Sequence, residues 1–435
     1  MASIQRRQTV SGAPAYIVKW KTPDGKHRTK GGFRTRKAAT AYATEVDHAQ
    51  QRGNVFDPAA GGITFREAAQ AWLASRHDLK PTTRYGYERA LAAYAACKKP
   101  RRSLGIDATF GGYPLNAIKR EHITDWVAKL VAAGRKPSTV YHNVAVVRMV
   151  LAQAVADGRI PFNPAAFVKL PTAIGNGVAD DPAKFLTADA VTALVGATPW
   201  PYNVLVHVAA WSGLRAGELA GLRVGDVALP KANSPSTTGA LRVERSVAAV
   251  NGALTYLPPK TKGSRRKVPL PAATTKLLRD YLKQHPHANN PLAPLFPAIG
   301  LGGKSAGVGA DADGLAVAEV EARLVLDWVN PLTHSTFYDR IYKPALTRAR
   351  RLSPNAGLPP RLAFHSLRHT YVSLCVAAGI PALEISRFAG HSTVTTTLGI
   401  YAHLFESDHS AAMSALGAMG SVPTTNVVPL RAAQG

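Results

Sequence analysis

The chain has 435 residues, too many for one ordinary hydrophobic core, so we expect two to four domains. Its 53 Lys and Arg against 27 Asp and Glu leave a formal net charge of +26, an excess that favours nucleic acid over an anionic membrane as partner. Two cysteines in separate regions, Cys97 and Cys375, argue against a disulfide scaffold and a structural zinc site. Since no apolar run has membrane-spanning or signal-peptide character, we expect a soluble protein of the cytoplasm.

Residues 1–60 predict a small basic module. Residues 16–20 alternate as a strand does, a turn signal follows at 23–26, and residues 27–29 can pair back as a hairpin. With a helix over 36–51, this module can form a three-stranded sheet packed on one helix. Aromatic residues alternate with the basic ones, which favours a DNA-contacting surface over a merely solvated face. The candidate DNA contacts are Lys26, Arg28, Lys30 and Arg34.

The second region predicts an all-α bundle of about four helices. Thr64 and Glu67 have capping-box spacing at its first helix, and later helices are expected over 120–133 and 137–157. Two helix starts combine basic with hydroxyl residues, a composition that suits phosphate binding at a helix N-terminus and that ordinary capping also explains. These candidate contacts are Lys80, Thr82, Thr83, Arg84, Lys136, Ser138 and Thr139.

A stretch rich in Pro, Gly and Ala at 171–184 indicates a linker to the third and largest region. That region begins with helices and continues with strands, the first two joined by the hairpin signal Asn251-Gly252. The expected elements are helices at 187–196 and 203–211 and strands at 241–250, 253–258 and 266–270. Residues 285–325 predict a long, partly mobile insertion, and the tail after 413 is expected to be disordered.

Four short segments of the third region combine unusual residues. They are SGLRAGEL at 212–219, the basic connection PKTKGSRR at 259–266, FHSLRH at 364–369, and AGHS at 389–392 with GIYAH at 399–403. Singly, each is weak evidence, because a lone Arg, His or Tyr usually has a structural role. Together they supply the groups that phosphoryl transfer at a DNA phosphate requires. Two Arg can clamp the non-bridging oxygens, His can manage protons, a Lys can protonate the leaving 5′-oxygen, and a Tyr can form a covalent intermediate.

This ordered set resembles the tyrosine recombinase (phage integrase) family. The residues that carry the resemblance are Arg215, Lys260, His365-x-x-Arg368, His391 and Tyr401. The segments SGLRAGEL, HSLRHT and GHSTVTTTLGIYAH are similar to the family's signatures. The resemblance implies that Tyr401 attacks the scissile phosphate, giving a 3′-phosphotyrosyl link and a free 5′-hydroxyl, while Arg215 and Arg368 hold the phosphate oxygens.

The resemblance also implies roles for the remaining residues. His365 would accept the proton of Tyr401, and His391 would donate a hydrogen bond to the phosphate. Lys260 would be the general acid, although spacing alone leaves Lys262 open, and Glu218 would support the first arginine. Because the covalent link conserves the phosphodiester energy, no ATP, metal ion or other cofactor is implied.

The implied fold is multidomain and mainly α with small β-sheets. It would comprise an N-terminal ββ(β)α arm-binding module, an all-α core-binding (SAM-like) domain, a mixed α+β catalytic domain and a flexible tail. The expected bounds are 1–60, 63–165, 178–412 and 413–435. The implied partners are double-stranded DNA at core-type and arm-type sites, a homotetramer in the synaptic complex and, where the reaction needs one, a recombination directionality factor or a DNA-bending host factor.

Other function classes explain the sequence less well. A metal-dependent nuclease or transposase would need clustered carboxylates, and the acidic residues show no such grouping. A non-enzymatic DNA-binding protein would not need every catalytic residue type. A type IB topoisomerase uses similar chemistry, but the two regions that precede the catalytic one fit recombination better.

Overall fold

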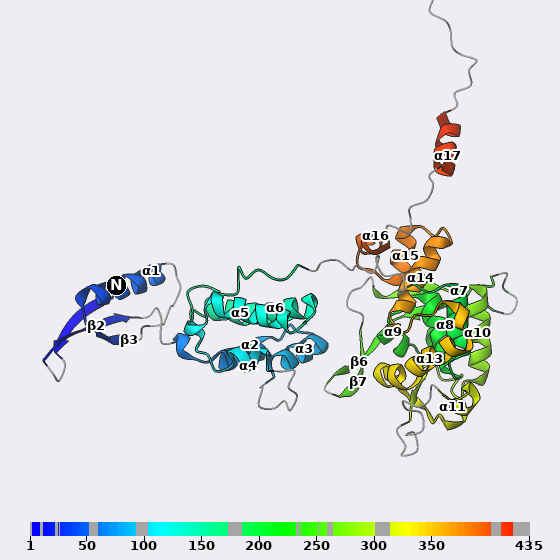
Figure 1. The fold of residues 1–435 in the computed structure, drawn as a ribbon, viewed down its shortest axis with the longest axis horizontal. Coiled ribbons are helices and arrows are strands. Elements are labelled where there is room, and N and C mark those ends of the chain that lie inside the picture. Colours follow the sequence, from blue (N-terminus) through cyan, green and yellow to red (C-terminus); the bar gives the residue numbers. More distant parts are fainter. Residues whose placement is uncertain are drawn as a thin grey trace, which may run out of the picture. The chain divides into compact units, whose positions relative to one another are not determined.

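The computed structural model describes the chain in thirteen stretches (Figure 1). They are residues 2–8, 12–21, 25, 27–51, 60–92, 103–172, 185–231, 234, 236–250, 252–258, 264–300, 314–401 and 410–420. The chain divides into two compact units, Met1–Gly175 and Asn176–Gly435. In the part of the chain that the structure describes, no helix is both long and apolar enough to cross a membrane.

The first unit begins with an antiparallel sheet of order β1-β2-β3 and one helix (Figure 1). The elements are β1 Ser3–Gln8, β2 Pro14–Lys21, β3 His27–Phe33 and α1 Arg36–Gln51. Val18 and Trp20 alternate along β2 with less buried residues and pack against Ala39, Ala43 and Val46 of α1. This alternation buries one face of the sheet under the helix. The predicted sheet-and-helix module is therefore confirmed.

A helical bundle with its own core follows in the same unit. Its helices are α2 Phe65–Ser75, α3 Pro81–Leu91, α4 Ile106–Phe110, α5 Arg120–Ala132 and α6 Pro137–Ala156, with 3₁₀ turns at Ala60–Gly62 and Leu115–Ala117. The predicted capping box starts α2: the Thr64 hydroxyl accepts from the Glu67 amide, and the Glu67 carboxylate accepts from the Thr64 amide. Pro occupies the first turn of both α3 and α6, where its missing N–H costs nothing.

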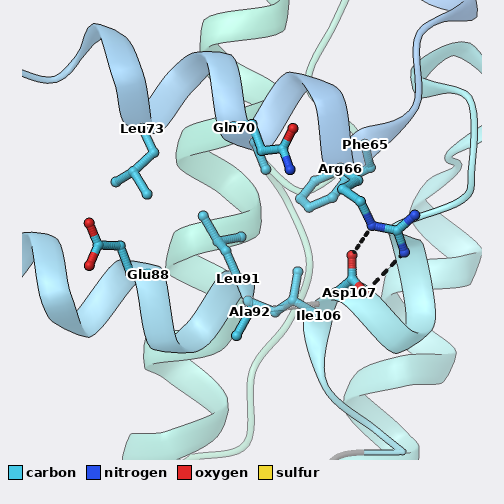
Figure 2. Close-up of a pocket in the computed structure, with 10 residues that line it drawn as sticks. Phe65, Arg66, Gln70, Leu73, Glu88, Leu91, Ala92, Ile106 and Asp107 are labelled. Atoms are coloured by element: carbon cyan, nitrogen blue, oxygen red, sulfur yellow. Dashed lines mark hydrogen bonds and ion pairs between the residues drawn. The ribbon is translucent and has the colours of Figure 1, made fainter. Parts of the chain in front are cut away.

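An ion pair ties the first and third helices of this bundle together. The Arg66 guanidinium donates twice to Asp107, with Nε–Oδ1 at 2.6 Å and Nη2–Oδ2 at 3.0 Å. A side chain at Gly111 would place its Cβ 2.3 Å from Asp107 Oδ1, so glycine is required there. Figure 2 shows this pair at one end of a pocket of about 230 Å³ between α2, α3 and α4, with Glu88 at the other end.

The second unit is mainly helical and carries three small antiparallel sheets among the described residues. Its helices are α7 Ala188–Gly196, α8 Tyr202–Ser212, α9 Ala216–Ala220, α10 Ala272–Gln284, α11 Val317–Arg323, α12 His334–Phe337, α13 Lys343–Leu352, α14 Ser366–Ala377, α15 Ala382–Ala389, α16 Val394–Tyr401 and α17 Ser410–Gly420. A π-helical turn, Tyr338–Tyr342, joins α12 to α13, and 3₁₀ turns lie at Val224–Asp226 and Pro354–Ala356. The strands are β4 Val227–Ala228, β5 Ala240–Val243, β6 Ser246–Val250, β7 Ala253–Leu257, β8 Arg266–Pro269, β9 Pro297–Ile299 and β10 Leu326–Pro331.

The single strand expected over 241–250 is wrong, because the chain breaks it into β5 and β6. At the break, Arg245 forms an ion pair with Asp226 and also donates to the Gly221 carbonyl at 3.4 Å. These contacts turn the chain out of the first sheet. As a result, β5 pairs with β4 and β8, while β6 pairs with β7 in a separate hairpin.

Two other expectations of irregular structure are wrong where the structure describes the chain. At the start of the expected insertion, Leu295 and Phe296 belong to the core and β9 pairs with β10. At its end, α11 buries Val320. Residues 301–313 lie outside the described residues. The expected disordered tail begins instead with the helix α17, and residues 421–435 also lie outside the description. Apolar side chains such as Leu295 stand between the Pro and Gly residues of 285–325 and pack into the core, which composition alone does not indicate.

We predict that Trp126→Ala destabilises the helical bundle by about 3–5 kcal/mol, because Trp126 is fully buried and leaves a large cavity. Its indole also donates to the Leu104 carbonyl at 2.8 Å, and that acceptor would be left unpaired. Hydrogen exchange of α5 and α6 peptides in the intact chain should then become at least about 100-fold faster. The matched change on the same helix, exposed Val131→Ala, should leave exchange almost unchanged.

Candidate active site

The loop that presents Arg215 is fixed by a glycine that no other residue can replace. α8 ends at Ser212, and Gly213 follows with φ +62°, a left-handed conformation that favours glycine. A Cβ at Gly213 would lie 2.3 Å from the Tyr371 ring, so the close packing of α14 on α8 also requires its absence. The chain then buries Leu214 and places Arg215 at the N-cap of α9.

Glu218 holds two arginines with one buried carboxylate. Arg215 donates to it from Nη1 at 3.0 Å and from its backbone amide at 2.9 Å. Arg266 donates from Nη1 at 3.0 Å and Nη2 at 2.8 Å, in the forked geometry that suits a carboxylate. Burial alone would raise the pKa of Glu218, but Arg266 and then Arg215 hold it below its ordinary value. The carboxylate therefore stays ionised.

The second arginine of this pair was not singled out from the sequence. Arg266 stands in the basic connection and begins β8, and its side chain is only 6% exposed, against 42% for Arg215. Arg266 stands two residues before the apolar Val268, and side chains two apart in a strand share a face, so this spacing could have indicated an inward-facing charge.

Arg266 and Arg215 also support the loop that precedes His391. Arg266 Nε donates to the Phe388 carbonyl at 2.7 Å, and Arg215 Nη2 donates to the Gly390 carbonyl at 2.8 Å. Gly390 has φ +69°, and a Cβ there would lie 2.7 Å from Arg266 Nη1. The glycine in the AGHS segment therefore lets the loop approach both guanidiniums.

α14 contributes a buried arginine and a more exposed histidine. Arg368 is buried, and its Nη1 donates to the Gly213 carbonyl at 2.7 Å. Burial, and then the charge of Arg215, lower the pKa of Arg368 to about 9, so it stays mostly charged at neutral pH. His365 lies at the N-cap of α14, and its pKa is lowered by desolvation and by the charges of Arg368 and Arg215.

His391 is held by the helix that follows it. Its Nδ1 lies 2.7 Å from the Thr397 hydroxyl of α16. Burial is the largest cause that lowers the pKa of His391 to about 4, followed by the charges of Arg368 and Arg215. The imidazole is therefore neutral at pH 7 and keeps one N–H to donate.

Tyr401 ends α16 with its side chain buried, being only 1% exposed. Burial raises the pKa of its phenol to about 12, against the opposing charge of Arg368. Its hydroxyl lies 2.5 Å from Nδ1 of His369, and the Phe185 ring packs edge-on against both rings. The contact expected of His365 is thus made by His369, which lies one turn further along α14 and level with the end of α16.

Six of the residues expected in the site come together in this unit. They are Arg215, Glu218, His365, Arg368, His391 and Tyr401, linked by the hydrogen bonds above or by the effect of one charge on another's pKa. Lys260 and Lys262 lie outside the described residues. His369 belongs to the HSLRHT segment, but the family resemblance implies no role for it, and its i+4 spacing from His365 is the signal that could have indicated one.

The register of the N-terminal sheet separates its basic residues onto two faces. Arg28 pairs with Trp20 and Lys30 with Val18, so both lie on the side of the sheet on which α1 packs, although both side chains are exposed at its edge, and Lys30 Nζ is 4.5 Å from the Tyr42 ring. Lys19 and Lys21 alternate with these buried residues and lie on the open face. Arg34 is exposed before α1, and Lys26 lies outside the described residues.

The two helix starts of the bundle are exposed or half-buried but lie apart. The Lys80, Thr82, Thr83 and Arg84 group starts α3, and the Lys136, Ser138 and Thr139 group starts α6, neither with a side-chain cap hydrogen bond. Arg89 near the end of α3 lines one pocket with Thr139. The beginning of α3 therefore lies roughly two turns, or about 10 Å, from that pocket.

Within the described ranges, no group of three or more His, Cys, Asp or Glu side chains could hold a metal ion.

Comparisons with known proteins agree on one family. The family model described as "Phage integrase family" matches residues 184–408, just over half of the chain. The chain is 25% identical over 382 residues to a protein described as a prophage phiRv2 integrase of Mycobacterium tuberculosis, covering 86% of this chain and 85% of that protein. It is 24% identical over 396 residues to a "Tyrosine recombinase XerC-like" protein of Caldanaerobacter subterraneus, covering 88% and 90%.

Solved structures show the same fold. The Tn1549 transposon integrase in complex with a circular intermediate DNA has a TM-score of 0.57 at 19% identity, covering 82% of this chain and 99% of that chain. A lambda integrase dimer bound to a COC' core site has a TM-score of 0.50 at 16% identity, covering 92% and 94%. The multidomain, mainly helical fold with small sheets that the sequence led us to expect is therefore confirmed.

We predict that the NMR signal of the His391 ring, assigned with His391→Asn, titrates near pH 4 instead of at the ordinary 6.5. Between pH 6.5 and 4, His391 is protonated in the unfolded chain but neutral in the folded chain. The free energy of unfolding should therefore decrease as the pH falls from 6.5 toward 4. His391→Asn should remove that part of the acid sensitivity. A ring that titrates at 6.5 or above would contradict the burial argument.

Proposed function

Since the chain belongs to the phage integrase family and is a site-specific tyrosine recombinase of mobile DNA such as a prophage, we propose that it cuts and rejoins each strand with Tyr401 as nucleophile. The observation that carries the proposal is the convergence of a buried phenol with the guanidiniums of Arg215 and Arg368. Attack by the phenol on phosphorus would leave a 3′-phosphotyrosyl link and a free 5′-hydroxyl.

The two arginines would bind the non-bridging oxygens of the scissile phosphate. Arg368 is anchored to the Gly213 carbonyl, and Arg215 follows Gly213 by only two residues, so both guanidiniums are preset beside one loop. Donors fixed before the reaction stabilise the added negative charge of the pentavalent transition state without first having to reorganise. Glu218 keeps Arg215 oriented but lies too deep to meet the phosphate itself.

Proton transfer would complete the reaction. Neutral His391 can donate its remaining N–H to a phosphate oxygen, and its Thr397 contact fixes the ring. Lys260 remains our proposed general acid for the 5′-oxygen, with Lys262 as the alternative. We also propose that the reaction needs neither ATP nor a metal ion, since the phosphotyrosyl bond keeps the energy of the phosphodiester.

The remaining parts of the chain would hold DNA. The helical bundle would bind core-type DNA through the helix starts at Lys80 and Lys136, where free backbone N–H groups suit phosphate. The N-terminal module would bind arm-type DNA and let one protomer bridge two sites. Four protomers would assemble on two duplexes, with a directionality or DNA-bending factor where the reaction needs one, in the bacterial cytoplasm.

We predict that the wild-type chain, mixed with fragmented DNA of its source genome in excess EDTA, forms covalent protein–DNA adducts that peptide mapping assigns to Tyr401. Sequencing the captured DNA should give the core site. Tyr401→Phe should abolish the adduct while changing DNA affinity by less than about threefold, because only the nucleophilic oxygen is removed. An adduct that survives in Tyr401→Phe, or that requires a divalent metal, would refute the proposed chemistry.

A second prediction concerns the face of the N-terminal sheet that binds DNA. Because α1 packs on the other face and stands in the way of a duplex there, the pair Lys19→Ala and Lys21→Ala should reduce the salt dependence of duplex binding by about one counterion for each lysine that meets a phosphate. The charge-matched pair Arg28→Ala and Lys30→Ala should change it less. Titration of the full chain with a duplex at several salt concentrations measures both slopes. Equal slopes for the two double variants would contradict open-face binding.

A further inference from the structure

We infer that His369 is a catalytic residue, the base that accepts the proton of Tyr401 when its phenol attacks phosphorus. The inference rests on the proposed function and deepens it, since the family resemblance gave this role to His365. Two observations carry it: a short hydrogen bond to the reacting oxygen, and the orientation of the alternative histidine.

The contact between His369 and Tyr401 joins two side chains that are both held in place. His369 Nδ1 lies 2.5 Å from the Tyr401 hydroxyl, slightly closer than an ordinary hydrogen bond and close enough for direct proton transfer. His369 is in the first turns of α14 and Tyr401 ends α16, so each is fixed by a helix backbone. Phe185 packs edge-on against both rings, with centroids 6.5 Å from His369 and 6.2 Å from Tyr401.

His365 is oriented for a different task. Its ring lies 5.1 Å from the His369 ring at 89°, and among the described contacts it makes no hydrogen bond to the Tyr401 hydroxyl. The charges that act on it are those of Arg368 and Arg215, the two proposed phosphate ligands. This neighbourhood suits a donor to a phosphate oxygen better than an acceptor from the phenol.

The Tyr401 phenol needs a base because burial raises its pKa to about 12. At pH 7 only about one molecule in 10⁵ would carry the phenolate without help. A neutral imidazole with its proton on Nε2 offers the Nδ1 lone pair to the phenol. Among the described residues, the charge of Arg368 acts on Tyr401, and His391 is near enough to His369 for its own pKa to be affected.

The proton and electron pairs balance in each direction. During cleavage, the Tyr401 O–H bond breaks, its proton moves to His369 Nδ1, the phenolic oxygen forms a bond to phosphorus, and the P–O5′ bond breaks. The leaving 5′-oxygen takes a proton from the general acid proposed above. During rejoining, the 5′-hydroxyl gives its proton back to the deprotonated general acid and attacks phosphorus, the bond from phosphorus to the Tyr401 oxygen breaks, and the His369 imidazolium returns its proton to the departing phenolate. The phosphotyrosyl diester carries the same single negative charge as the starting diester, so the positive charge gained by the His369 imidazolium is balanced by the proton that the general acid gives to the 5′-oxygen.

The test uses the full chain and a nicked suicide duplex that carries the core site identified by covalent capture. His369→Gln and His369→Ala should each slow adduct formation by about 10²–10⁴-fold while DNA affinity and thermal stability stay near wild type. Added imidazole should restore part of the rate of His369→Ala. A fluorinated tyrosine at position 401, whose phenol is more acidic, should restore part of the rate of both variants.

Two controls distinguish a base from a merely positioning residue and from the general acid. The wild-type rate should level off at high pH, whereas His369→Gln should keep rising about tenfold per pH unit as hydroxide replaces the base. A 5′-bridging phosphorothiolate substrate, whose sulfur leaves without a proton, should not rescue His369→Gln. The matched variant His365→Gln should be slower than wild type but show no rescue by fluorotyrosine and an unchanged pH profile.

Each outcome decides the inference. A His369→Gln rate within about threefold of wild type, rescue of it by the phosphorothiolate, or fluorotyrosine rescue of His365→Gln alone would overturn it. If His369→Ala fails to fold, the His369→Gln pH profile and the fluorotyrosine response still decide. The proposed function fails separately, if wild type forms no adduct or Tyr401→Phe forms one, whereas failure of the inference leaves the wild-type adduct intact.

Discussion

The carboxylate of Glu218 is the interaction on which the rest of the site depends. It is buried between Arg215 and Arg266 and accepts four hydrogen bonds from them. Removing one member of such a buried pair leaves an uncompensated charge, which typically costs about 3–5 kcal/mol. Because Arg266 begins β8 and also donates to the Phe388 carbonyl, one carboxylate connects the first arginine loop, the strand after the basic connection and the turn before His391.

Apart from Glu218 and the two arginines bound to it, the described part of the site carries an excess of positive charge. Arg368 is buried against a backbone carbonyl, and its pKa is lowered both by burial and by Arg215. Each like charge also lowers the pKa of the nearby histidines. A phosphodiester would relieve this repulsion, and its transition state, with one more negative charge, would relieve it further. The same electrostatics that destabilise the site without DNA therefore favour the reaction once DNA is bound.

The sequence predicted residue types and periodicity well and side-chain direction poorly. The Thr64 capping box, the prolines that begin α3 and α6, and the Asn251-Gly252 hairpin are local signals, and the elements they mark are present. The break between β5 and β6 depends on Arg245 reaching Asp226, a tertiary contact without a local signal. Likewise, only the packing of α14 beside α16 decides that His369 and not its neighbour one turn away meets Tyr401, and only the fold turns Arg266 inward.

The Gly213 carbonyl has a mechanical consequence. It accepts from Arg368, and the chain that carries it reaches Arg215 two residues later, so at most about 7 Å of backbone separates the anchors of the two guanidiniums. The distance between the anchors of the two guanidiniums is therefore set by covalent geometry and one hydrogen bond. The helices on either side, α8 and α14, come from distant parts of the sequence. Should those helices shift within the unit, the two guanidiniums would therefore move together, because one short loop carries both of their anchors.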